Sequence, residues 1–268
     1  MHRSLPVLIG RDHDKPNEGG VTCPCFVCNL DGRTWILEGR IDTLLRPDAV
    51  VDRLLYAVVA NLIVGIIGAF FVLRLAFGWN VGSPQQSGFG TWTRTILSVI
   101  VGLALGLAIY AASGGPTSDP VLIANAFAQV LVVSAAEILV CWAVVAAVFE
   151  AVLRDSNRWA AIVVGAVAGS ALFGLYHFAH SAPFNSWGMV AFLSTIGLIT
   201  SLFFFVSRDV YGTIVFHNFM GVLGVANALA AKGQLASMAT VQVPLFATAA
   251  ATILLLLALD HLWLRRRA

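Results

Sequence analysis

Six ionisable side chains lie within or at the edge of long apolar stretches, where a charge is costly and usually serves a function. They are Glu137, Glu150, Arg154, His177, His180 and His217. Carboxylates and imidazoles are the side chains that most often transfer protons or bind metal ions. A carboxylate, an arginine and two histidines that met in one buried cluster could therefore activate a water molecule or hold a metal.

The spacing of these residues indicates which of them share a helix face. Glu150 and Arg154 are four residues apart, so they lie on one face at the membrane boundary, where a simple ion pair is an alternative role. His177 and His180 are three residues apart, and each could instead make a hydrogen bond to a neighbouring helix. A carboxylate, two histidines and an arginine on three helices could therefore meet in one buried cluster.

Glu137 is expected to stand apart from this cluster. It precedes Glu150 by about 20 Å along a straight α-helix and lies roughly on the opposite face. We therefore expect Glu137 to make a separate polar contact with Ser134. His217, by contrast, lies in the middle of another apolar stretch beside Asn218, and a histidine at that depth favours a functional role.

The sequence around these residues resembles the CPBP family of intramembrane proteases, which comprises CAAX endopeptidases and bacteriocin-processing proteins. The family carries E-E-x-x-x-R, F-x-x-x-H and H-x-x-x-N on separate helices. Here Phe149-Glu150-Ala-Val-Leu-Arg154 matches the first motif from its second glutamate onward. The second motif is matched by Phe173-Gly-Leu-Tyr-His177.

The third motif is matched by His217 alone. Gly221 stands where the family has asparagine, and the neighbouring Asn218 points about 100° away from His217 on a helix. Phe149 stands where the family has its first glutamate, which is thought to activate water. The similarity covers residues 131–225, with two departures from the family pattern.

The resemblance implies a site in which water between two histidines attacks a peptide carbonyl. Glu150 acts there as a base or orients a histidine, and Arg154 fixes Glu150. The implied catalytic residues are Glu150, Arg154, His177 and His217. The secondary candidates are His180, Asn218 and Glu137.

Three functions remain open at this point. The resemblance implies an endopeptidase of a prokaryotic plasma membrane that cleaves membrane-proximal bonds of a polypeptide. Phe149 and Gly221 favour an inactive relative that serves as a scaffold or an assembly subunit among partner subunits. In a transporter or cofactor-binding protein, His177 and His217 on facing helices could ligate haem or a metal.

The N-terminal part contains a cysteine cluster, Cys23-Pro-Cys25-Phe-Val-Cys28. The pair Cys25-x-x-Cys28 has the spacing of one zinc knuckle, but a closed zinc site needs four ligands. His13 or a partner chain could complete a zinc clip. The alternative is that these cysteines are surface or lipid-modified residues without a metal.

The elements that must position all these residues are transmembrane helices. Of the 268 residues 59% are hydrophobic and only 11% are charged, against about a quarter in a soluble domain. The mean hydropathy is +0.85, and a net charge of +2 provides no basic surface for nucleic acid. We expect an all-α, polytopic helical membrane protein in contact with the lipid bilayer, with a polar segment at 1–53 and a membrane domain at 54–268.

Seven stretches have the length of about 20 residues that a membrane span needs. They are Leu54–Phe77, Thr95–Ala112, Val121–Leu153, Trp159–His180, Trp187–Val206, Tyr211–Ala230 and Val243–Leu264. Val121–Leu153 could form one tilted helix or two short passes, so six to eight spans are possible. Basic residues fall on alternate loops, which the positive-inside rule places in the cytoplasm. The N-terminal segment is then outside if Val121–Leu153 crosses once, and inside if it crosses twice.

Overall fold

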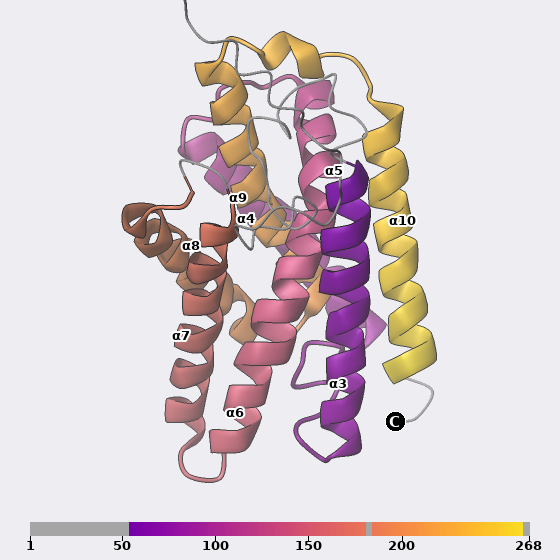
Figure 1. Cartoon of the computed structure of the whole chain (residues 1–268), viewed down its shortest axis with the longest axis vertical. Coiled ribbons are helices and arrows are strands. Elements are labelled where there is room, and N and C mark those ends of the chain that lie inside the picture. Colours follow the sequence, from indigo (N-terminus) through magenta and orange to yellow (C-terminus); the bar gives the residue numbers. More distant parts are fainter. Residues whose placement is uncertain (1–53, 181–183, 265–268) are drawn as a thin grey trace, which may run out of the picture. The chain divides into compact units, whose positions relative to one another are not determined.

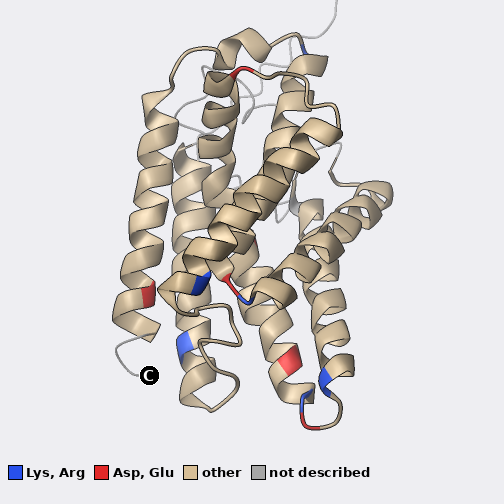
Figure 2. Cartoon of the chain, turned by 180° about the vertical axis from the view of Figure 1, so that it is seen from behind, with Lys and Arg blue, Asp and Glu red and all other residues tan. Residues whose placement is uncertain are grey.

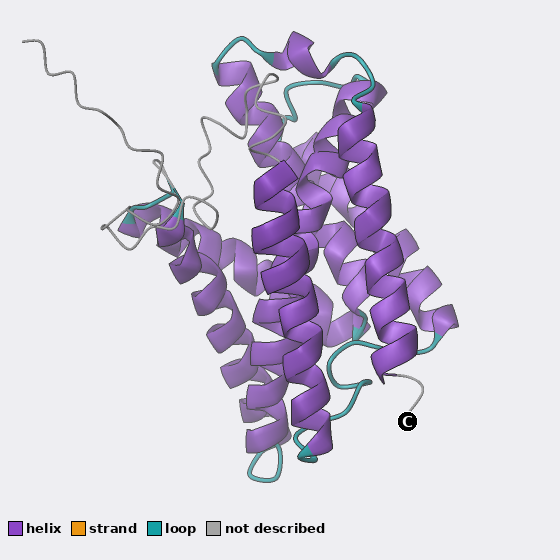
Figure 3. Ribbon diagram, turned by 45° about the vertical axis from the view of Figure 1, so that its right-hand side comes forward, coloured by secondary structure: helices purple, strands orange, loops and turns teal. Residues whose placement is uncertain are grey.

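The computed structural model describes residues 54–180 and 184–264, and every regular element in these two ranges is a helix (Figure 3). The elements are η1 (Tyr56–Ile67), α3 (Gly68–Gly78), α4 (Trp92–Ala112), α5 (Pro120–Glu137), η2 (Ile138–Ala146), α6 (Ala147–Leu153), α7 (Arg158–Tyr176), η3 (His177–Ala179), α8 (Trp187–Ser207), α9 (Val210–Ala231), η4 (Leu235–Met238), α10 (Val243–Leu259) and η5 (Asp260–Leu264). Three of them, η1, η2 and η5, are π-helical, whereas η3 and η4 are short 3-10 helices. The expected all-α fold is confirmed.

Seven helical stretches in the described ranges are long and apolar enough to span a membrane. The longest, Pro120–Leu153, runs through α5, η2 and α6 without a break, so it forms one span (Figure 1). The fourth span ends at Tyr176 instead of His180, because the chain tightens into η3 and His180 has an extended backbone. The chain is therefore a polytopic membrane protein whose F-x-x-x-H motif lies at a helix end.

Local sequence sets the ends of the helices that carry the motifs. At the start of α7, the side chain of Asn157 accepts hydrogen bonds from two backbone N–H groups of the first turn, which is the usual role of an N-cap residue. Between α8 and α9 the chain reverses within two residues. Arg208 takes a left-handed conformation with a φ of 51°, and Asp209 caps α9 by accepting from the N–H of Gly212.

Small residues let these helices approach one another closely. A Cβ added to Gly102 of α4 would lie 2.5 Å from the carbonyl oxygen of Gly212 in α9. One added to Gly169 of α7 would lie 2.6 Å from the carbonyl oxygen of Cys141 in η2. Cys141 itself is buried. Such contacts fix helix positions in a membrane, where no water drives association.

The basic residues of the described ranges gather towards one end of the helices. Arg74 lies near the end of α3, Arg154 and Arg158 flank the α6–α7 turn, and Arg208 follows α8. Lys232 follows α9 at the opposite end, and Figure 2 shows this asymmetry in blue. Because Pro120–Leu153 crosses once, the positive-inside rule predicts that the basic end faces the cytoplasm and that the first span starts outside.

This orientation predicts which exposed loop residues react with a membrane-impermeant maleimide in intact cells. In a variant whose native cysteines are replaced, Ser113→Cys in the α4–α5 loop should be labelled from outside. Ser156→Cys in the α6–α7 turn should be labelled only after permeabilisation, because both serines are exposed but lie at opposite ends of their spans. If Ser156→Cys but not Ser113→Cys were labelled in intact cells, the protein would have the opposite orientation.

Candidate functional site

A group of polar side chains meets between α5, α7 and α9, and we call it the Glu137 cluster. It consists of Glu137, Tyr176, His177, His180 and His217. Glu137 is the last residue of α5, and the π-helical η2 begins directly after it; such widened turns are frequent at functional sites. His217 lies within α9, and the other members lie at and beyond the end of α7. The cluster therefore depends on the packing of three separate helices.

Both carboxylate oxygens of Glu137 have partners. Oε2 lies 3.1 Å from Nε2 of His217, and the hydroxyl of Tyr176 donates a hydrogen bond to Oε1. His217 is buried, and the side chain of Glu137 is only 11% exposed. A carboxylate in this setting is held in place, because turning either oxygen away would break a hydrogen bond that water cannot easily replace.

A hydrogen bond between Glu137 and His217 requires a proton on one of the two groups. Thr200 donates its hydroxyl proton to the carbonyl of Ile196 at 3.1 Å, so the same oxygen accepts from Nδ1 of His217 at 2.9 Å. Nδ1 therefore carries a proton, and the contact between Nε2 and Glu137 requires a second one on the imidazole or the carboxyl group. The pair is thus able to give a proton to a group that approaches it.

His177 presents a basic nitrogen. Its Nδ1 donates to the carbonyl of Phe173 at 2.6 Å, so Nε2 of the neutral ring keeps its lone pair. His177 follows the last residue of the fourth span. Burial lowers the pKa of His177 below its usual value, although the charge of Glu137 acts in the opposite direction. The neutral imidazole, which can accept a proton, is therefore the main form at pH 7.

His180 adds a second imidazole beyond the span. Its ring centroid is 4.9 Å from that of His177, and its Nε2 lies 3.3 Å from the hydroxyl of Tyr56. Burial, and after it the neighbouring His177, lower the pKa of His180 to about 4. When Tyr56 donates to Nε2, the neutral ring carries its proton on Nδ1. That atom has no hydrogen-bond partner among residues 54–180 and 184–264, so His180 offers a buried donor.

Aromatic rings enclose the two motif histidines. The ring of Phe173 lies 4.9 Å from that of His177 and 5.0 Å from that of His217, between centroids. Trp142 lies 5.6 Å from His217 and is itself anchored by donating to Ser201 at 2.7 Å. An apolar surround of this kind strengthens the hydrogen bonds inside it, because the local dielectric constant is low.

Glu150 is also buried, but it belongs to a different contact. Its two oxygens lie 2.5 and 2.7 Å from the guanidinium nitrogens of Arg208. Arg154, the expected partner of Glu150, is exposed. The expected meeting of Glu150 and Arg154 with His177 and His217 is therefore absent, because the α8–α9 turn brings a better placed guanidinium to the carboxylate.

The expected contact between Ser134 and Glu137 is also replaced. Ser134 donates to the side-chain oxygen of Asn218 at 3.0 Å, and the amide of Asn218 donates to the carbonyl of Phe127 at 3.0 Å. Asn218 therefore joins α9 to α5. Glu137 does not pair with Ser134 and is the carboxylate that contacts His217.

The two departures from the family motifs lie outside the cluster. A side chain at Gly221 would collide with Val130 of α5, so this position faces a helix contact. Phe149 is 46% exposed on the surface of α6 and does not fill the space between the histidines. The lack of a carboxylate at position 149 therefore leaves the cluster complete, since Glu137 supplies one.

Sequence reasoning missed several partners of these groups, namely Tyr56, Tyr176, Thr200 and Arg208. A signal for Glu137 existed, because it lies in the middle of the Pro120–Leu153 span while Glu150 lies near its end. A carboxylate at full membrane depth is the more costly of the two and thus the stronger functional candidate.

The described residues give limited support to a metal site. Among residues 54–180 and 184–264, no three His, Cys, Asp or Glu side chains are placed to hold a metal ion. Both nitrogens of His217 are engaged by Thr200 and Glu137, which does not fit an axial haem ligand. The predicted zinc clip of Cys23, Cys25 and Cys28, with His13, lies outside the described residues.

No protein-family model matches the chain, and no curated protein or solved structure matches it. The described part of the chain is a polytopic helical membrane protein with buried polar and charged residues. Any more specific function has to be argued from the geometry of the Glu137 cluster.

Proposed function

We propose that this protein is an intramembrane endopeptidase that hydrolyses membrane-proximal peptide bonds of a polypeptide, as its resemblance to the CPBP family implies. The observation that carries the proposal is the 3.1 Å contact of Glu137 with His217, beside the basic nitrogen of His177. These groups supply a proton donor and a proton acceptor in one enclosed site. The setting proposed for the reaction is a prokaryotic plasma membrane.

The proposed reaction uses each group once. Nε2 of His177 takes a proton from water while the water oxygen attacks the peptide carbonyl carbon. The developing oxyanion accepts from Nδ1–H of His180, a buried donor that suits a negative oxygen. The C–N bond then breaks, the proton between Glu137 and His217 passes to the leaving amine, and the proton on His177 restores that pair. Water thus divides between a new carboxyl group and a new amine.

The test is cleavage of a panel of synthetic transmembrane peptides by the purified protein in lipid nanodiscs. Glu137→Gln should lower the cleavage rate at least about 100-fold, because the amide cannot exchange a proton with His217. The matched control is the double variant Glu150→Gln/Arg208→Gln, which removes the other buried carboxylate together with its counter-charge. Equal cleavage by wild type and a folded Glu137→Gln variant would reject the proposed site.

A second function is supported by a specific observation. Asn218 is committed to Ser134 and Phe127, and Gly221 packs on Val130, so neither position gives the amide donor of the third family motif. This favours an inactive relative that acts as a membrane scaffold or an assembly subunit. Stable co-purification of partner subunits, together with no cleavage of any peptide in the panel, would support this function instead.

A further inference from the structure

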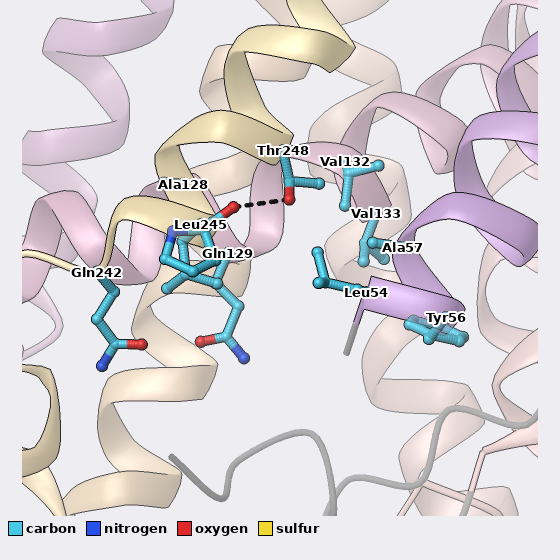
Figure 4. A pocket seen from close by; sticks show the side chains of 11 residues that line it. Leu54, Tyr56, Ala57, Ala128, Gln129, Val132, Val133, Gln242, Leu245 and Thr248 are labelled. Atoms are coloured by element: carbon cyan, nitrogen blue, oxygen red, sulfur yellow. Dashed lines mark hydrogen bonds between the residues drawn. The ribbon is translucent and has the colours of Figure 1, made fainter. Parts of the chain in front are cut away.

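A small cavity lies between η1, α5 and α10, beside the Glu137 cluster. It has a volume of about 80 Å³. Figure 4 shows the side chains of Ala57, Val132, Val133 and Leu245 around it. An apolar cavity of about 150 Å³ stays dry and takes up benzene, so this smaller space suits a short aliphatic group better than an aromatic ring.

Two polar side chains at the wall of the cavity make hydrogen bonds within the chain. The hydroxyl of Thr248 donates to the carbonyl of Pro244 at 2.8 Å, and the amide of Gln242 donates to the carbonyl of Ser237 at 2.9 Å. These donors are therefore satisfied by the chain itself.

Two features connect the cavity to the Glu137 cluster. Gln129, Val133 and Glu137 are spaced by four residues, so the cavity-lining residues and the carboxylate share one face of α5. Tyr56 lines the cavity, and its hydroxyl contacts Nε2 of His180. A polypeptide that presents a carbonyl to the cluster would therefore have a neighbouring side chain beside the cavity.

We infer that this cavity binds a short aliphatic side chain, such as that of leucine or valine, of the polypeptide that reaches the Glu137 cluster. The inference rests on the proposed function for the source of the side chain. The size, the apolar wall and the shared face of α5 select an aliphatic residue adjacent to the reacting bond. The cavity thus sets which bonds are presented for cleavage.

The experiment labels the protein in nanodiscs with azibutanol, a short aliphatic alcohol that carries a photoreactive diazirine, and maps the adducts by mass spectrometry. We expect adducts on Val132, Val133 or Leu245. Ala57→Phe should abolish them, because Ala57 is buried at the cavity and the added ring fills it. The matched control is Val58→Phe on the neighbouring residue, whose side chain is 41% exposed, and it should leave the adducts unchanged.

Competition by a peptide then tests the source of the aliphatic group without requiring turnover. A transmembrane peptide with leucine adjacent to the bond that would be cleaved should suppress labelling of the Glu137→Gln protein. The same peptide with glycine in place of this leucine should not suppress it. Adducts that survive Ala57→Phe, or that neither peptide suppresses, would overturn the inference. Suppression by the leucine peptide without any cleavage by wild type would uphold the cavity and reject the proposed hydrolysis.

Discussion

Replacing His177 with glutamine is expected to lower kcat for peptide cleavage by about 10²- to 10⁴-fold, the usual contribution of one proton-transferring side chain. Nδ1 of His177 donates to the carbonyl of Phe173, which leaves Nε2 as the nitrogen that can accept a proton from water. Glutamine fills a similar space but cannot take up that proton. The measurement is single-turnover cleavage of a peptide that the wild-type protein cuts.

The pH dependence separates a proton-transfer role of His177 from a merely structural one. Burial lowers the pKa of His177 below its usual value, which is about 6.5 in model peptides. The imidazole stays neutral, and able to accept a proton, at every pH above this lowered pKa. Wild-type kcat/KM should therefore stay constant as the pH is lowered from 7 and should fall only below about pH 6.5. The residual activity of His177→Gln should lack this fall. An acid limb that is identical in both proteins would contradict the assignment.

Replacing Glu150 with alanine is expected to lower the free energy of unfolding by about 3–5 kcal/mol, because it leaves the charge of Arg208 without its partner. The two groups are joined by two short contacts, and their side chains are only 2% and 15% exposed. Arg208→Ala should have an effect of similar size for the converse reason. Arg154→Ala changes an exposed side chain and should stay within about 0.5 kcal/mol of wild type.

The double variant Glu150→Ala/Arg208→Ala distinguishes a paired contact from two independent ones. It should be less destabilised than the sum of the single variants, because no unpaired charge remains. Steric trapping in bilayers would measure these free energies of unfolding. Additive effects of the two substitutions, or a large effect of Arg154→Ala, would show that Glu150 is held by a different partner.

The contacts of Glu137 and Glu150 differ from those that the sequence predicts. The face predicted for Glu137 assumes a straight α-helix, whereas the nine residues of η2 between the two glutamates are π-helical. Hydrogen bonds in a π-helix run from i to i+5, so each residue turns by a smaller angle. The local pairing of Glu150 with Arg154 was equally reasonable from spacing, yet Arg208 is brought to Glu150 by the turn between α8 and α9.

The sequence by itself determined that the protein is a polytopic helical membrane protein, whereas the structure decided that residues 120–153 cross once. Burial of about 20 apolar residues in lipid depends on composition along one segment, and helices are the form in which a single segment satisfies its own backbone. It also supplied Glu137 and the three histidines of the cluster as candidates. Only the tertiary structure decided that Glu137 contacts His217 and that Glu150 contacts Arg208. Those two contacts depend on how helices far apart in the chain rotate and pack. The spacing of residues within one helix carries no information about this packing.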